Sequence, residues 1–292
     1  MGRKILLLIG ASAVVTGGVG AMAGCENLDT PARPDAGSNA TASCILPSDP
    51  VVPCGSQYVL GDPGADLAGA GQMRSWAKMD PATNKALEFT ISMPLDAVQT
   101  LNQATVDSSY WVEVPQPIKA QTVLQSFRVD YLSQGHPPAG VYNTRHLDFH
   151  IFIMSKEQAL AISCQPQADK TFPPEGMLPA GWALFDPPLN CVPVHGMPAV
   201  NRLAPEFNGV QFVTAVGLTF YKSTFASWEP KLATQAMLER RPEFTFDLAL
   251  MKGDPQSTMP RGLYPTKMVV TYDQPHGAYL FAIKDFQQWP PP

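Results

Sequence analysis

Along most of the chain, short runs of alternating apolar and polar residues are separated by turns that contain Pro and Gly. In residues 86–93, Leu87, Phe89, Ile91 and Met93 share one face of an extended segment, because successive side chains of a strand point to opposite sides. The same pattern predicts strands at 72–79, 86–93, 121–131, 146–154, 212–220, 244–251, 267–272 and 279–283. Short helices are expected at 94–102, 156–162 and 230–240.

Strands with few helices and no repeat of fixed period predict a mainly β fold. We expect one antiparallel domain over residues 56–292, either a β-barrel or a sandwich with a few short helices, α+β at the margin. The 30 Pro and 22 Gly residues agree with this, because both types favour turns over long helices. With 45% hydrophobic and 15% charged residues, the chain has the apolar material for a sizeable core and is neither a disordered tail nor a coiled coil.

The charge of the chain argues against a nucleic-acid partner. Its formal net charge is −5, and its 20 Lys and Arg residues form no basic cluster beyond short pairs. Phosphate backbones are bound by concentrated positive surface, which this sequence lacks. Association into a homo-oligomer is compatible with the composition.

The N-terminus has the order of a secretory signal: two basic residues, an apolar stretch and small residues that end at Cys25. The stretch is too broken by Gly for a lasting membrane span. A Cys directly after Ala-Gly resembles a bacterial lipobox, although Met22 stands where Leu is usual. The sequence therefore predicts a signal peptide over residues 1–24 and a lipid on Cys25 that anchors an extracytoplasmic protein to the membrane, in the periplasm or at the cell surface. Simple cleavage near Ala23 is the alternative.

The cysteines agree with export. Four of the five Cys remain beside Cys25, and in an oxidising compartment they are expected to pair. The favoured pairs are Cys44–Cys54 and Cys164–Cys191, because each lies within one Pro-rich stretch; the other two connectivities stay open. A zinc knuckle is disfavoured because no C-x-x-C spacing occurs. Residues 25–55 are predicted to form a flexible tether with a disulfide loop.

The segment that can carry chemistry runs from 135 to 153, where three of the five His residues fall. On a strand, His146, Asp148 and His150 share one face. Imidazole nitrogens and a carboxylate are good ligands for zinc, copper or iron. The sequence therefore predicts a transition-metal site, with His136, His195 and Glu229 as further candidate ligands.

The spacing limits a single site. At about 3.3 Å per residue, His146 and His150 are about 13 Å apart on a straight strand. Metal–nitrogen bonds are about 2.1 Å long, so both reach one ion only if the strand curves or carries a bulge. Otherwise one His and Asp148 are ligands and the other His lies outside. Leu147 stands where a zincin motif requires Glu, which excludes that class of metalloprotease.

Two other interpretations remain open. The His and Asp residues can form a buried hydrogen-bond network in a non-catalytic structural or assembly module, and Glu229 can be the acid at the start of a helix. A metal-dependent oxygenase or hydrolase is the third hypothesis. The chain has neither a G-x-S-x-G elbow nor a P-loop, so no motif of this kind indicates an enzyme. Whether the protein is an enzyme stays open.

Residues 135–158, GHPPAGVYNTRHLDFHIFIMSKEQ, resemble the signature of a bacterial extracytoplasmic family with Thermus members, domain-of-unknown-function family 5602. That family reads G-H-E-P-P-G-x-Y and then P-H-F-D-F-H-F-Y. Weaker pieces in the same order, such as LPAGW at 178–182 and WEP at 228–230, extend the similarity from about Gly71 to Phe286.

The resemblance implies a shared polar set, made up of His136, His146, Asp148, His150 and Glu229. The chain departs from the family at two places. Pro137 replaces the Glu after G-H, and residues 196–201 correspond to the family's G-M-G-x-H-W but contain no His. His195, immediately before them, is the only residue there that can substitute.

We predict that the fragment from Glu26 to Pro292, made in the periplasm, has no free thiol, because all four of its Cys residues are expected in disulfides. A thiol assay under denaturant checks this, with a reduced sample as the positive control. Four free thiols without reductant would contradict both the pairing and the compartment.

Overall fold

The computed structural model describes residues 43–44, 52–53, 55–61, 66–67, 71–174, 176–185, 190–239, 243–248 and 259–290. All of them belong to one compact unit, Thr41–Pro292. The predicted signal peptide over 1–24, the lipidation site Cys25, most of the tether and Cys54 lie outside the described residues. The predicted Cys44–Cys54 pair therefore stays a prediction.

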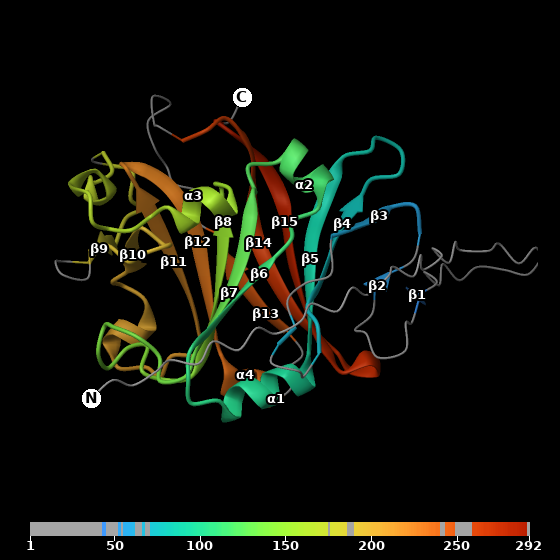
Figure 1. The fold of residues 1–292 in the computed structure, drawn as a ribbon, viewed down its shortest axis with the longest axis horizontal. Helices are drawn as coiled ribbons and strands as arrows, with labels where there is room; N and C mark the ends of the chain where they lie inside the picture. The colour runs from blue at the N-terminus through green and yellow to red at the C-terminus, as the bar shows by residue number, and fades with distance from the viewer. Residues whose placement is uncertain are drawn as a thin grey trace, which may run out of the picture. The chain divides into compact units, whose positions relative to one another are not determined.

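The fold contains two larger antiparallel sheets (Figure 1). The seven-stranded sheet has the order β6–β7–β8–β12–β11–β10–β9 and the six-stranded sheet the order β13–β14–β15–β5–β4–β3. The strands of the first sheet are β6 (Ser108–Val112), β7 (Ser126–Leu132), β8 (His146–Phe152), β9 (Trp182–Leu184), β10 (Met197–Asn201), β11 (Thr214–Tyr221) and β12 (Thr224–Ala233). Those of the second are β3 (Tyr58–Leu60), β4 (Arg74–Met79), β5 (Ala86–Pro94), β13 (Glu243–Asp247), β14 (Gly262–Asp273) and β15 (Ala278–Trp289). A separate pair is formed by β1 (Ser43–Cys44) and β2 (Val52–Pro53).

The two larger sheets pack face to face through aromatic side chains. The ring of Phe149 on β8 lies 4.6 Å from that of Phe281 on β15, measured between centroids. The ring centroids of Trp228 on β12 and Tyr264 on β14 are 5.9 Å apart. The mainly β, antiparallel prediction is confirmed, and its sandwich form fits. The barrel alternative is wrong, because neither sheet closes on itself in the described part of the chain.

Short helices lie at the two ends of the sheets, α1 with α4 at one end and α2 with α3 at the other (Figure 1). Their bounds are α1 (Leu95–Gln103), α2 (Gln116–Gln121), α3 (Lys156–Leu160) and α4 (Thr234–Leu238). The helices predicted at 94–102 and 156–162 are confirmed as α1 and α3, the second shorter than expected. No helix within the described residues has the length and apolar character needed to cross a membrane.

The helix predicted at 230–240 is wrong over its first turn. Strand β12 continues through Pro230 to Ala233, and only α4 is helical. Nine consecutive residues of β12 are buried, so contacts on both faces of the sheet override the local helix signal. Pro230 lacks an N–H and so cannot donate a hydrogen bond to β8. Accordingly, β12 pairs with β8 at Trp228 and again at Lys231, and Pro230 between them has no partner on β8. Glu229 is therefore a strand residue and not the acid at the start of a helix.

Strand β8 is buried over its whole length. Its apolar residues Leu147, Phe149 and Ile151 belong to the main hydrophobic core. The alternation of a strand sends His146 and His150 to the opposite face of the sheet, where loops cover them. A buried polar face needs partners for each of its groups, and these partners form the site described below.

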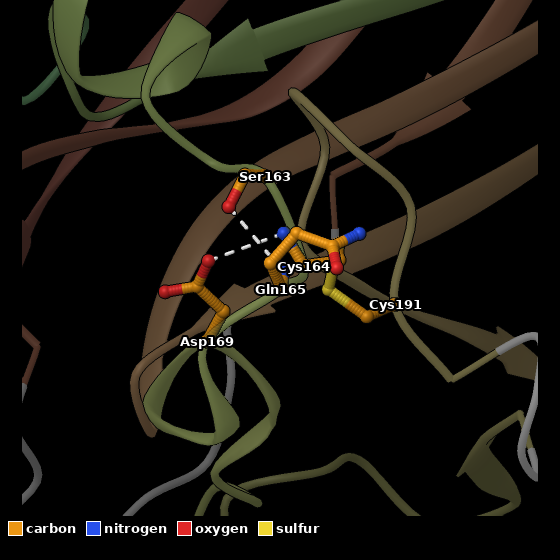
Figure 2. The surroundings of a disulfide bond; sticks show 5 residues. All are labelled: Ser163, Cys164, Gln165, Asp169 and Cys191. Atoms are coloured by element: carbon orange, nitrogen blue, oxygen red, sulfur yellow. Dashed lines mark hydrogen bonds between the residues drawn. A yellow bond between two sulfur atoms is a disulfide. The ribbon is translucent and has the colours of Figure 1, made fainter.

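A disulfide fixes one of the covering loops. Cys164 and Cys191 are bonded, as predicted, across a sequence separation of 27 residues. Figure 2 shows the bond and the backbone N–H of Cys164, which donates to Asp169 Oδ2 at 3.2 Å. A disulfide is compatible with an extracytoplasmic location.

Candidate metal centre

The register of three adjacent strands gathers ionisable groups on the outer face of the seven-stranded sheet. Asp148 of β8 stands opposite Asp130 of β7 on one side and opposite Lys231 of β12 on the other. Glu229, two positions before Lys231 on the same strand, shares that face. His146 and His150 flank Asp148 along β8, so the polar groups form one continuous patch.

The loop between β7 and β8 brings in His136. Gly135 has a φ of +69°, and a Cβ atom at this position would lie 1.8 Å from the Tyr142 carbonyl oxygen, so only Gly fits. The next residue then pairs across the loop, with the His136 N–H donating to the Tyr142 carbonyl at 3.1 Å. This places the His136 ring 5.0 Å from the His146 ring, measured between centroids.

A tight turn after the disulfide brings in His195. Val192 and Gly196 pair across the turn, and the Val194 N–H donates to the Ile162 carbonyl at 2.8 Å. Gly196 has a φ of +92°, and a Cβ there would approach the Phe220 carbonyl oxygen to 2.4 Å. The turn holds the His195 ring stacked on His150, with centroids 4.2 Å apart and planes 20° apart.

We call His136, His146 and Asp148 the first triad. His146 Nε2 lies 3.1 Å from Asp148 Oδ1, and His136 Nε2 lies 3.2 Å from Asp148 Oδ2. The other ring nitrogens contact backbone carbonyls, His146 Nδ1 at 2.7 Å from Thr144 and His136 Nδ1 at 2.6 Å from Pro137. A carbonyl oxygen only accepts hydrogen bonds, so Nδ1 carries the proton in both rings and both Nε2 atoms face the carboxylate.

We call Asp130, His150 and His195 the second triad. Asp130 Oδ2 lies 3.0 Å from His150 Nε2 and 3.1 Å from His195 Nε2. The opposite nitrogen of His150, Nδ1, is 3.1 Å from Glu229 Oε1. Each triad offers three ligand atoms within 4.8 Å of one another, so each can hold a metal ion.

Lys231 lies between the two triads. Its Nζ donates to Asp148 Oδ2 at 2.9 Å and to Glu229 Oε2 at 3.4 Å. All three of these side chains are buried. The ammonium therefore compensates two carboxylates, one in the first triad and one that contacts the second.

The buried charges shift one another's pKa values. Burial alone lowers the pKa of His150, but the negative charges of Glu229 and Asp130 outweigh it and raise this pKa to about 9. Burial alone raises the pKa of Glu229, but the positive charges of Lys231 and His150 outweigh this effect and lower the pKa. Burial and the charge of His150 lower the pKa of His195. The two stacked imidazoles are therefore shifted in opposite directions, the pKa of His150 upward and that of His195 downward.

Both triads open onto one cavity of about 240 Å³. Its polar lining consists of His136, Asp148, Lys231, Glu229, Asp130 and His195. Aromatic and aliphatic side chains, among them Tyr142 and Phe185, make up the rest of the wall. A small molecule in this cavity would therefore contact the edges of both triads in a largely apolar enclosure.

The structure brings all of the candidate ligands into this patch. They are His136, His146, Asp148, His150, Glu229 and His195. His146 and His150 belong to different triads, which agrees with the distance that separates them on a strand. The fifth His of the chain, His276, lies outside both triads and contacts Asp273 at 2.9 Å.

Asp130 and Lys231 were missed by sequence reasoning. Each carries a charge within an apolar strand, between Val129 and Tyr131 or between Pro230 and Leu232. That position was the available signal, because a charge in such a run is buried only with a partner. Which partner it meets depends on strand order.

Comparison with models of protein families, with curated proteins and with solved structures finds no match to the chain. The resemblance to family 5602 stays a prediction. The assignment of the site therefore depends on its geometry alone.

Replacing Lys231 with Met is expected to lower the free energy of unfolding by about 3–5 kcal/mol, because it leaves two buried carboxylates without their cation. Urea denaturation of the metal-free protein measures this. The matched control is Lys267→Met, which breaks an exposed pair with Asp285 at 3.5 Å and is expected to cost about 0–1 kcal/mol. Equal losses in the two variants would show that Lys231 does not compensate the site.

Proposed function

We propose that the protein binds a divalent transition metal through the first triad, outside the cytoplasm. The observation that carries this proposal is the meeting of two imidazole Nε2 atoms with one carboxylate. His146 Nε2 and Asp148 Oδ1 are buried and 3.1 Å apart, yet neither has a hydrogen-bond partner. An unsatisfied buried polar group costs about 1–3 kcal/mol, so the arrangement favours a cation that all three side chains share.

The polar-network alternative accounts for the first triad less well. Both Nδ1 atoms already donate to carbonyls, so a network would require a second proton on each ring. Asp148 would then face three positive groups, His136, His146 and Lys231, with the two rings 5.0 Å apart and His146 fully buried. A single metal ion accepts both lone pairs in place of two protons.

The spacing of the donors supports the same proposal. Ligand bonds of about 2.1 Å at tetrahedral or octahedral angles place neighbouring donor atoms about 3.0–3.4 Å apart. The two Nε2–carboxylate distances, 3.1 and 3.2 Å, lie in that interval. The carbonyls of Thr144 and Pro137 act as the outer partners that orient metal-bound imidazoles.

Zinc, copper and iron all accept two imidazoles and one carboxylate. Three protein ligands leave at least one coordination position for water or another ligand. His136 and Asp148 line the cavity, so a molecule bound there would lie beside the first triad. This favours metal-dependent catalysis, as a hydrolase or an oxygenase, as the second candidate function, and binding without turnover remains the first.

We also propose that the protein is a lipoprotein of the cell envelope. The signal-like N-terminus and Cys25 support this, and the Cys164–Cys191 disulfide supports an oxidising compartment. Replacing Cys25 with Ser is expected to release the full chain from the membrane fraction, as measured by fractionation and immunoblotting. Equal membrane association of the variant and the wild type would contradict the lipid anchor.

Zinc binding tests the metal proposal. The protein is purified without affinity metal, stripped with a chelator, dialysed against zinc and analysed for metal per chain. His136→Asn is expected to hold one equivalent less than the wild type, because it removes one of the three ligands. The His136 side chain lies on a loop and is already partly exposed, so its replacement disturbs the fold little.

The matched control is His276→Asn, which removes an imidazole outside both triads and is expected to hold as much zinc as the wild type. If His136→Asn and the wild type hold equal zinc, the first triad is not the site. An unchanged melting temperature on adding the chelator to the zinc-loaded wild type would also count against the proposal.

A further inference from the structure

We infer that the second triad is a separate site for a divalent transition metal, with Glu229 as the outer carboxylate that orients His150. The inference goes beyond the proposed function, because the two triads share no ligand. Each can therefore be removed without removing a ligand of the other.

Three segments far apart in sequence supply the donors: Asp130 from β7, His150 from β8 and His195 from the turn after the disulfide. Both imidazole Nε2 atoms point at the same oxygen, Asp130 Oδ2, at 3.0 and 3.1 Å. These distances fit donor atoms around one ion, as they do in the first triad.

Asp130 is oriented for this role by its other oxygen. Arg128 Nε donates to Asp130 Oδ1 at 2.6 Å, while Arg128 NH2 donates to Ser109 Oγ at 2.7 Å. The guanidinium therefore fixes the carboxylate from the side of the neighbouring strand. Oδ2 contacts the two imidazoles, and Asp130 lines the cavity.

His150 is oriented by Glu229. Its Nδ1 lies 3.1 Å from Glu229 Oε1, so Nε2 is the nitrogen that points to Asp130. A carboxylate behind a ligating imidazole is the usual outer arrangement of protein metal sites. Glu229 is itself fixed by Lys231, whose Nζ is 3.4 Å from Oε2.

A charged network of His150 between Asp130 and Glu229 is the rival explanation. Such a network would be complete with His150 alone. The structure adds the imidazole of His195 to the same oxygen, from a turn that requires Gly196 and is held beside Cys191. Two imidazoles and one carboxylate at the wall of a cavity make a donor set that suits a transition metal.

The experiment counts zinc per chain in a set of variants of the full protein, measured by equilibrium dialysis after chelator treatment. The wild type and the His276→Asn control are expected to hold two equivalents. His195→Asn and His136→Asn are each expected to hold one, and the double variant none. Asp130→Asn, which keeps the size of the side chain, is expected to lose the same equivalent as His195→Asn.

Glu229→Gln tests the orienting role. It keeps the shape of the side chain and removes its charge, and it is expected to weaken the second site by about 10- to 100-fold while two equivalents still bind at high zinc. Unchanged zinc affinity in this variant would overturn the role given to Glu229.

The outcomes separate the two proposals. One equivalent in the wild type that persists in His195→Asn and disappears in His136→Asn overturns the second site and leaves the first. The reverse pattern overturns the first site and supports the second. No zinc in any of the proteins overturns both.

Discussion

The compensation of charge around the buried Asp148 is the constraint on which the rest of the site depends. Its two oxygens meet His146 on one side and both His136 and Lys231 on the other. In a buried environment a carboxylate is kept ionised only by close positive charge or hydrogen bonds. Strand order and loop structure around β8 supply these partners.

The sandwich makes this possible because β8 is an internal strand of its sheet, between β7 and β12, and is buried over its whole length. One face packs through Phe149 against the other sheet and stabilises the fold as any apolar core does. The other face is covered in part by loops that carry His136 and His195, with the cavity between them. Gly135, Gly196 and the Cys164–Cys191 disulfide hold these loops near the strand.

Lys231 gives the site an internal cation between two groups of ligands. It balances Asp148 and Glu229, and so it links the carboxylate of the first triad to the carboxylate behind His150. The two triads therefore differ in character. In the first the two imidazoles face different oxygens of Asp148, whereas in the second both Nε2 atoms contact one oxygen, Asp130 Oδ2.

The sequence by itself determined the β class and the common face of His146, Asp148 and His150, because the two-residue period of a strand is a local property. It also determined the Cys164–Cys191 pair as the favoured one. The tertiary structure decided that Pro230 lies in a strand, because burial on both faces outweighs local propensity. It also decided that His146 and His150 belong to different triads, and that Asp130 and Lys231 complete the patch. These contacts depend on which strands are neighbours and in what register, and long-range pairing of that kind leaves no pattern along a single chain.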